Sequence, residues 1–125
     1  MNYQDSSVRF DIAVDGILIR ANFHGVSTVT GTDAFIREIE KQISVQGRGV
    51  IRILMDLRSL NSVPIRVHIK MSAWLIKVKS EISQVVVLGG GRAARTLAKG
   101  ARMQNVYFSE SEAEALKVWR VDSST

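Results

Sequence analysis

An apolar run that stops at three glycines is the first feature of this sequence that could do chemistry. Residues 85–95 read VVVLGGGRAAR, and Gly89, Gly91 and Ala94 match the G-x-G-x-x-[GA] pattern of dinucleotide-binding turns. Glycine lets the backbone approach a phosphate closely, and the N-terminus of a following helix offers free N–H groups. The candidate anion-binding residues are Gly89, Gly90, Gly91 and Arg92.

Several parts of a nucleotide site are missing around these glycines. The dinucleotide pattern belongs on the first strand-to-helix turn of its fold, with an acidic residue about 20 positions on, whereas here it comes late in the chain. Glu110 and Glu112 lie near that distance, but they fit a helix-capping sequence. Arg92 and Ala93 follow Gly91, where a phosphate-binding loop has a lysine and a hydroxyl residue. A tight turn that needs positive φ explains the glycines more simply.

Asp56 follows an apolar stretch, residues 50–55, that is expected to form a strand buried on both faces. Ligands of α/β proteins bind at the carboxyl edge of such strands, so Asp56 is a candidate ligand-binding or general-base residue. Ser59 and Ser62 lie in the predicted loop after it and join the candidate site. The simpler role for Asp56 is to cap the loop 57–63 through backbone N–H groups.

The sequence offers no further catalytic or metal-binding pattern. It contains no Ser-His-Asp order, nucleophile elbow or carboxylate pair. It has no cysteine, and His24 and His68 lack a second ligand at metal spacing. We therefore expect a protein without enzymatic activity, without a metal and without a cofactor.

Basic residues recur at helical spacing on two predicted helices, and the net charge of the chain is +5. Such stripes can face an acidic partner, or they can be the solvated polar faces that amphipathic helices need. Nucleic acid is not favoured as the partner, because aromatic residues make up only 6% of the chain and none alternates with the basic residues. The candidate partner surface consists of Arg66, Lys70, Arg95, Lys99 and Arg102.

The elements that would position these residues begin with a hairpin. Residues 8–14 and 17–24 alternate between apolar and polar, as strands with one dry face do. The Asp-Gly pair at 15–16 suits a type I′ turn between them. Thr32 can cap a helix of apolar residues at helical spacing, which Gly47 or a neighbouring glycine ends.

Segment 63–79 decides the fold class. It begins with alternating residues, VPIRVHIKM, as a strand would. However, Pro64 suits the first turn of a helix and the apolar residues after it follow helical spacing, so we predict a helix. After it we predict a buried strand, a helix and a short strand, at residues 84–88, 91–103 and 105–108.

A capping box opens the last predicted helix. In residues 109–112, Ser-Glu-Ser-Glu, the first serine would cap the helix and the glutamate three positions on would complete the box. Ala113, Leu116 and Trp119 would form the apolar side of this helix. The resulting order is ββαβαβαβα. Strands that alternate with helices form a parallel sheet, and the hairpin adds an antiparallel edge, so the predicted fold class is α/β.

This element order resembles the STAS superfamily, which includes anti-sigma-factor antagonists and cytoplasmic domains of sulfate transporters. The resemblance covers roughly residues 8–120 and is carried by MDLRSL at the end of the third strand, by VVVLG, and by an Ala-Leu-x-x-Trp pattern at residues 115–119. The chain is most similar to the SpoIIAA-like branch, often described as STAS-like with kinship to lipid-transfer CRAL-TRIO domains. The resemblance implies one STAS-like domain, residues 1–125, that works by binding.

The resemblance also implies where a regulatory switch would lie. Anti-sigma-factor antagonists typically carry Asp-Ser-Ser-Gly at the start of the helix after the third strand, and one of these serines is phosphorylated. The corresponding stretch here, residues 64–67, reads Pro-Ile-Arg-Val and has no hydroxyl group. The phosphoserine switch therefore does not carry over, and the SpoIIAA-like branch commonly lacks that motif.

Size and composition are those of one globular domain. The chain has 125 residues, of which 46% are apolar, and no run approaches the ~18 apolar residues of a membrane span. Its N-terminus lacks a signal pattern, so we expect a cytoplasmic protein. Two functions fit: a regulatory module that binds a protein partner or a second copy of itself, as in a homodimer, or a carrier or sensor of a small apolar or anionic ligand, lipid-like or nucleotide, held between helices and sheet.

Overall fold

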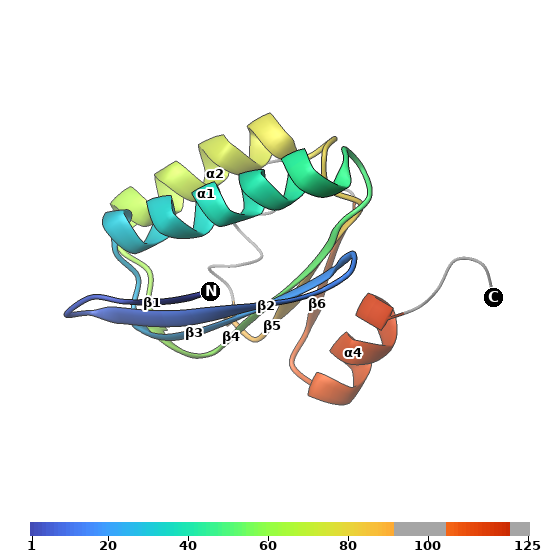
Figure 1. The fold of residues 1–125 in the computed structure, drawn as a ribbon. Coiled ribbons are helices and arrows are strands. Elements are labelled where there is room, and N and C mark those ends of the chain that lie inside the picture. The colour runs from blue at the N-terminus through green and yellow to red at the C-terminus, as the bar shows by residue number, and fades with distance from the viewer. Residues whose placement is uncertain (92–104, 121–125) are drawn as a thin grey trace.

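The computed structural model describes residues 1–91 and 105–120 of the chain. Its six-stranded sheet has the strands in chain order: β1 (Asn2–Gln4), β2 (Val8–Asp15), β3 (Leu18–Val26), β4 (Arg52–Ser62), β5 (Gln84–Leu88) and β6 (Val106–Ser109). The first three strands are antiparallel, and β3 to β6 are parallel. Helices α1 (Val29–Gln46) and α2 (Ile65–Val78) cover one face of the sheet, and α4 (Glu112–Arg120) lies on the other (Figure 1).

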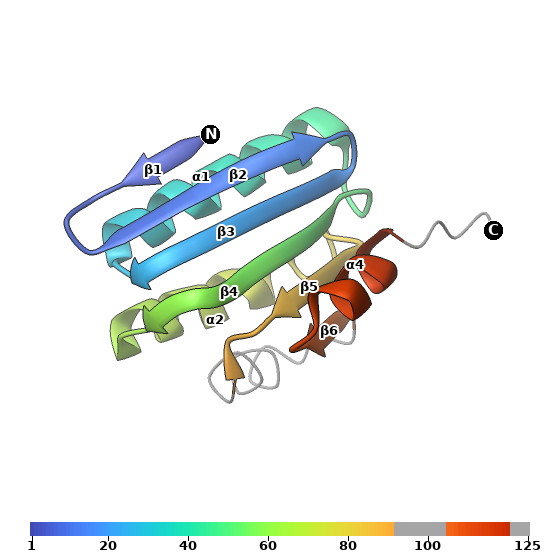
Figure 2. The ribbon, with the colours of Figure 1, turned by 90° about the horizontal axis from the view of Figure 1, so that it is seen from below.

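The predicted α/β fold with an antiparallel N-terminal hairpin is confirmed. Strand β5 shows why its sequence is an unbroken apolar run. Val85 and Val87 belong to the core under α1 and α2, whereas Val86 and Leu88 pack under α4 with Trp119. A strand covered on both faces needs apolar residues at every position. Figure 2 shows that α4 covers only the β4–β6 part of its face of the sheet. On that face, no described helix covers β1 to β3.

The segment that decides the fold class is helical, as predicted. Pro64 stands at the N-cap of α2 with φ −59°, and the helix runs from Ile65 to Val78. The five apolar residues whose helical spacing supported the prediction turn toward the sheet, which overrides the strand-like alternation at the start of the segment. These buried residues are Val67, Met71, Trp74, Leu75 and Val78.

Two predicted boundaries near the N-terminus are wrong. The hairpin turns at Gly16-Ile17, one residue later than predicted, because Asp15 still pairs with Leu18 and Gly16 takes the positive φ. Helix α1 begins at Val29 rather than after Thr32, because the hydroxyl of Thr28 accepts the N–H of Gly31 at 3.0 Å and caps the helix. The short strand β1, before the predicted hairpin, was not predicted.

The loop predicted at 57–63 is also wrong, because β4 continues to Ser62 alongside the full length of β3. The ladder between these strands contains two irregularities: β4 has one extra residue opposite Phe23, and a second between the partners of Gly25 and Val26. Ser59 and Ser62 therefore lie on the strand, paired with His24 and Val26.

The serine that caps α4 lies two residues later than predicted. The hydroxyl of Ser111 accepts the N–H of Glu114 at 3.5 Å, whereas the hydroxyl of Ser109 accepts the N–H of Ser111 and stays outside the helix. Glu112, the acid predicted to close the box, instead accepts a hydrogen bond from Arg20. The inward face of α4 is formed by Ala115 and Trp119, while the predicted Ala113 is exposed.

The helix predicted at 91–103 lies outside the described residues, apart from Gly91. Among the helices that are described, none combines the length and the hydropathy of a membrane span.

Candidate functional site

The predicted site residues Asp56 and Gly89–91 come together at the carboxyl ends of β4 and β5. Asp56 is paired in register with Leu88, and the glycines follow directly. Ser59 and Ser62 lie farther along β4, where their neighbours are residues of β3 rather than the glycines. Arg92 lies outside the described residues.

The three glycines form a left-handed turn, with φ of +79°, +80° and +55°. The N–H of Gly89 donates to the carbonyl of Ser109 at 2.9 Å, so the turn is tied to β6. A Cβ on Gly89 would lie 2.9 Å from Cγ of Arg58 and 3.1 Å from its backbone nitrogen. At this position glycine is needed to make room for Arg58, independently of any ligand.

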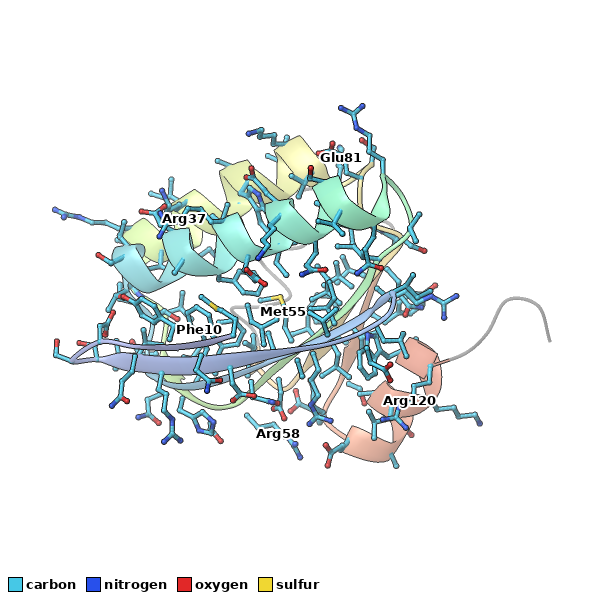
Figure 3. The ribbon with its side chains drawn as sticks, in the orientation of Figure 1. Phe10, Arg37, Met55, Arg58, Glu81 and Arg120 are labelled. Atoms are coloured by element: carbon cyan, nitrogen blue, oxygen red, sulfur yellow. The ribbon has the colours of Figure 1, made fainter. Side chains whose placement is uncertain are left out.

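Asp56 is the centre of a cluster of charges on the α4 side of the sheet. Its carboxylate accepts from the side chain of Arg58 twice, with Nε at 3.0 Å and Nη2 at 2.7 Å, and from the Arg58 backbone N–H at 3.2 Å. Nη2 of Arg20 donates to it at 3.1 Å. Glu112 Oε1 accepts from the same Arg20 atom at 2.6 Å and lies 3.5 Å from Arg58. Figure 3 shows Arg58 on the opposite side of the sheet from Phe10 and Met55.

The cluster keeps Asp56 ionised. Burial, which leaves only 10% of its side chain exposed, raises the pKa of Asp56, but the hydrogen bonds and charges of Arg58 and Arg20 outweigh burial and the pKa is lowered. The hydrogen bond and charge of Arg20 likewise lower the pKa of Glu112. A carboxylate held by four donors is a weak base, so this geometry argues against the general-base role considered for Asp56.

The cluster joins parts of the chain that are far apart in sequence. Arg20 comes from β3, Asp56 and Arg58 from β4, and Glu112 from the first turn of α4. Two positive and two negative side chains offset each other, so the cluster gives a bound anion little net attraction. The ion pairs of Glu112 with Arg20 and Arg58 hold the first turn of α4 against the sheet. Arg20 and Arg58 were not predicted as site residues, and Glu112 was predicted to belong to the capping box.

A small apolar cavity, of about 70 Å³, lies between the sheet and the N-terminal parts of α1 and α2. Ser27, Thr32 and His68 are its polar residues. An engineered cavity of roughly 150 Å³ takes one benzene, and ligand pockets span roughly 300–1,000 Å³. The apolar residues of the lining are Phe23, Phe35, Met55, Leu57, Leu60, Val63, Val67 and Met71.

The outer side of α2 exposes three isoleucines. Ile65, Ile69 and Ile76 are 75%, 64% and 51% exposed, and at 100° per residue they lie within about 40° of one another on the helix. They point away from the buried side of α2. We call these three residues the isoleucine face. The sequence signal for it was the spacing i, i+4, i+11, which remained unexplained once the core positions of the helix were assigned.

Cations flank the isoleucine face. Arg66 and Lys77 lie on one side and Lys79, the C-cap residue, on the other, and none of the three forms an ion pair with a described residue. Lys70, which was predicted for the same surface, instead pairs with Asp33 of α1 at 2.5 Å. The other predicted partner residues, Arg95, Lys99 and Arg102, fall outside the described part of the chain.

A metal site is not formed by the residues described. Within 1–91 and 105–120, no three His, Asp or Glu side chains come close enough together to hold an ion.

Several solved structures share this fold. An uncharacterized protein of the DUF3478 family from Shewanella loihica PV-4, with a SpoIIAA-like fold, matches with a TM-score of 0.68 and 15% identity over 95% of this chain and 98% of that chain. An anti-sigma factor antagonist from Mycobacterium paratuberculosis matches with a TM-score of 0.61 and 15% identity, over 92% and 96% of the two chains. The anti-sigma factor antagonist SpoIIAA in its unphosphorylated form matches with 0.56 and 13%, over 86% and 93%.

These likenesses show that the chain has a SpoIIAA-like fold, as its sequence resemblance implied. No family model and no curated protein matches the sequence.

Proposed function

We propose that this protein is a non-enzymatic regulatory module of the cytoplasm that binds a protein partner through the isoleucine face of α2. The observation that carries the proposal is the exposure of Ile65, Ile69 and Ile76 on one side of a well-packed helix. Large apolar side chains scattered singly over a surface need no explanation, but an aligned set indicates an interface. The fold is that of proteins described as anti-sigma factor antagonists, which supports a regulatory role.

The helix that presents this face is rigidly held. Trp74 of α2 packs edge-on against Phe35 of α1, and its indole N–H donates to Glu40 at 3.1 Å. The ion pair between Lys70 and Asp33 joins the same two helices. A fixed helix lets a partner bind without first ordering the surface, which lowers the cost of association.

The regulation we propose does not use a phosphoserine. Ile65 and Arg66 occupy the first turn of α2, and both are exposed without offering a hydroxyl group. Binding would then be controlled by the amount of the partner protein, or by covalent modification of that partner.

Native mass spectrometry of the protein purified from its own host tests the proposal. We expect a complex of defined stoichiometry that the triple variant Ile65→Ser, Ile69→Ser, Ile76→Ser no longer forms. Val45→Ser is the matched control, because Val45 is a 73% exposed aliphatic residue on α1 and should retain the complex. A complex that the triple variant retains in full would rule out this face.

The second candidate function is a carrier or sensor of a small ligand. The small cavity supports this function by its location, because a ligand of this kind was predicted to lie between the helices and the sheet. Its volume of about 70 Å³ opposes it for a lipid or a nucleotide. In the same mass spectra, a ligand that co-purifies and is lost on substitution of Leu60 by Trp would favour this alternative.

A further inference from the structure

The chemistry of the partner can be inferred from the charges around the isoleucine face. We infer that this face takes an acidic amphipathic segment of another protein, with apolar side chains against Ile65, Ile69 and Ile76 and carboxylates against the flanking cations. The inference rests on the proposed function and goes beyond it by specifying what the partner presents.

The length of the face sets the size of the segment. From Ile65 to Ile76 the helix rises about 16 Å, since each residue adds 1.5 Å. A partner helix of about three turns spans that length, and its own residues at i, i+4 and i+7 or i+11 would meet the isoleucines. Apolar contact of this kind gives affinity without specificity for charge, so the partner's charge has to be argued separately.

The charge of α2 is entirely positive. Its 14 residues contain no Asp or Glu. Of the acids around α2, Asp33 pairs with Lys70 and Glu81 with Arg48 at 3.1 Å, whereas Glu40 accepts only the neutral indole N–H of Trp74 and keeps its charge. Arg66, Lys77 and Lys79 form no ion pair in the described part of the chain, although Lys77 lines a surface hollow together with Glu40 and Glu81. Three unpaired cations beside an apolar stripe complement carboxylates and repel a basic surface.

A second copy of this chain fits the face less well. Two copies packed antiparallel through their isoleucines would bring Arg66 of one near Lys77 of the other, and like charges across an interface oppose association. An anionic membrane fits less well too. A helix that lies in a membrane surface buries a wide apolar face by roughly 5–10 Å, whereas the wide apolar face of α2 is already packed on the sheet.

Selection from a random peptide library displayed on phage tests the inference. Peptides of about 16 residues are selected on the wild-type protein and counter-selected on the triple isoleucine variant. We expect the enriched peptides to carry net negative charge, with apolar residues at helical spacing. Synthetic copies, measured by fluorescence anisotropy, should bind Ile69→Ser and the double variant Arg66→Glu, Lys77→Glu at least about tenfold more weakly than wild type.

Two controls sharpen the measurement. Lys117→Glu reverses a single cation on α4, on the other face of the sheet, and should leave peptide binding unchanged. Raising the salt from about 0.05 M to about 0.5 M should weaken the acidic peptides progressively, because exposed charges are screened.

The outcomes separate this inference from the proposed function. Enriched peptides that are neutral or basic, or that bind the charge variant as well as wild type, overturn the inference, and the isoleucine face still stands as the interface if the triple variant loses its host complex. A selection without any isoleucine-dependent peptide also overturns it. Co-sedimentation with phosphatidylserine vesicles, or a dimer in sedimentation equilibrium, assigns the face to a membrane or to a second copy if the triple variant abolishes it.

Discussion

Gly89 lies directly against Arg58, so that a Cβ on Gly89 would sit 2.9 Å from Cγ of Arg58. The contact links the two features that first suggested a ligand site. Arg58 has to pass this point because its guanidinium binds Asp56 in two places, and Gly89 has to leave it room. The first of the three glycines is thus explained by packing.

Substituting Gly89 by alanine should therefore destabilise the protein strongly. The variant would place a side chain at φ +79° and against the backbone of Arg58, which cannot give way easily. We expect the free energy of unfolding, measured with urea, to fall by about 2–4 kcal/mol. Gly16→Ala is the control, because Gly16 has φ +59° with nothing within 4 Å, and should cost about 1 kcal/mol. Equal losses for the two variants would mean that the contact with Arg58 is unimportant.

The Asp56 cluster should make the protein sensitive to acid. The pKa values of Asp56 and Glu112 are lowered in the folded chain and return to about 3.8 and 4.5 on unfolding. As the pH falls, the unfolded state therefore takes up protons before the folded state does. The stability that these two groups contribute is complete above about pH 5 and is lost as the pH falls below 4 toward their folded values.

Asp56→Asn should remove most of this contribution. At pH 7 we expect the free energy of unfolding to fall by about 2–4 kcal/mol, because two guanidinium groups lose their shared carboxylate. Urea unfolding between pH 7 and pH 3 should then show a shallower acid dependence than in wild type. Asp15→Asn, which changes an exposed carboxylate without an ion pair in the described residues, should behave like wild type. A wild-type acid dependence in Asp56→Asn would contradict the assignment.

Kinase treatment should add no phosphate near the start of α2, where anti-sigma-factor antagonists carry their phosphoserine switch. Ser59 and Ser62 are the nearest hydroxyl residues, and both lie on β4, where the carbonyl of Ser62 accepts the N–H of Ser27 at 3.1 Å. A kinase needs an extended segment that is free of such pairing. Intact mass after incubation with host lysate and ATP should show no added phosphate. Phosphate on Ser59 or Ser62 together with altered partner binding would refute this expectation.

Nucleotides should bind weakly or not at all beside the glycines. The nearby charges of Arg20, Asp56, Arg58 and Glu112 offset one another, and surface attraction is largely screened at about 0.15 M salt. Isothermal titration with ATP, GTP and NAD should give no micromolar affinity. Binding that fades equally for all three with added salt would reflect only a basic surface, whereas micromolar binding that Arg92→Ala abolishes would show that the glycine motif is functional.

The fold class could be predicted from the sequence because it depends on local patterns. The apolar run of β5 and the helical spacing from Val67 to Val78 each arise within one element, and the side-chain geometry of strands and helices fixes which residues turn inward. Boundaries were less predictable where two hydroxyl residues compete, as Thr28 and Thr32 do for α1, or Ser109 and Ser111 for α4. Either residue can cap, and tertiary packing selects one.

What the sequence by itself determined was thus the order and type of most elements, and the absence of a hydroxyl group at the start of α2. Only the tertiary structure decided that Glu112 reaches Arg20, 92 positions earlier, and that Ile65, Ile69 and Ile76 stay outside. Pairing of distant side chains depends on which strands become neighbours, and an apolar residue is buried only if another element covers it. Neither condition can be read from the neighbouring residues in the sequence, because both arise when the sheet and helices pack together.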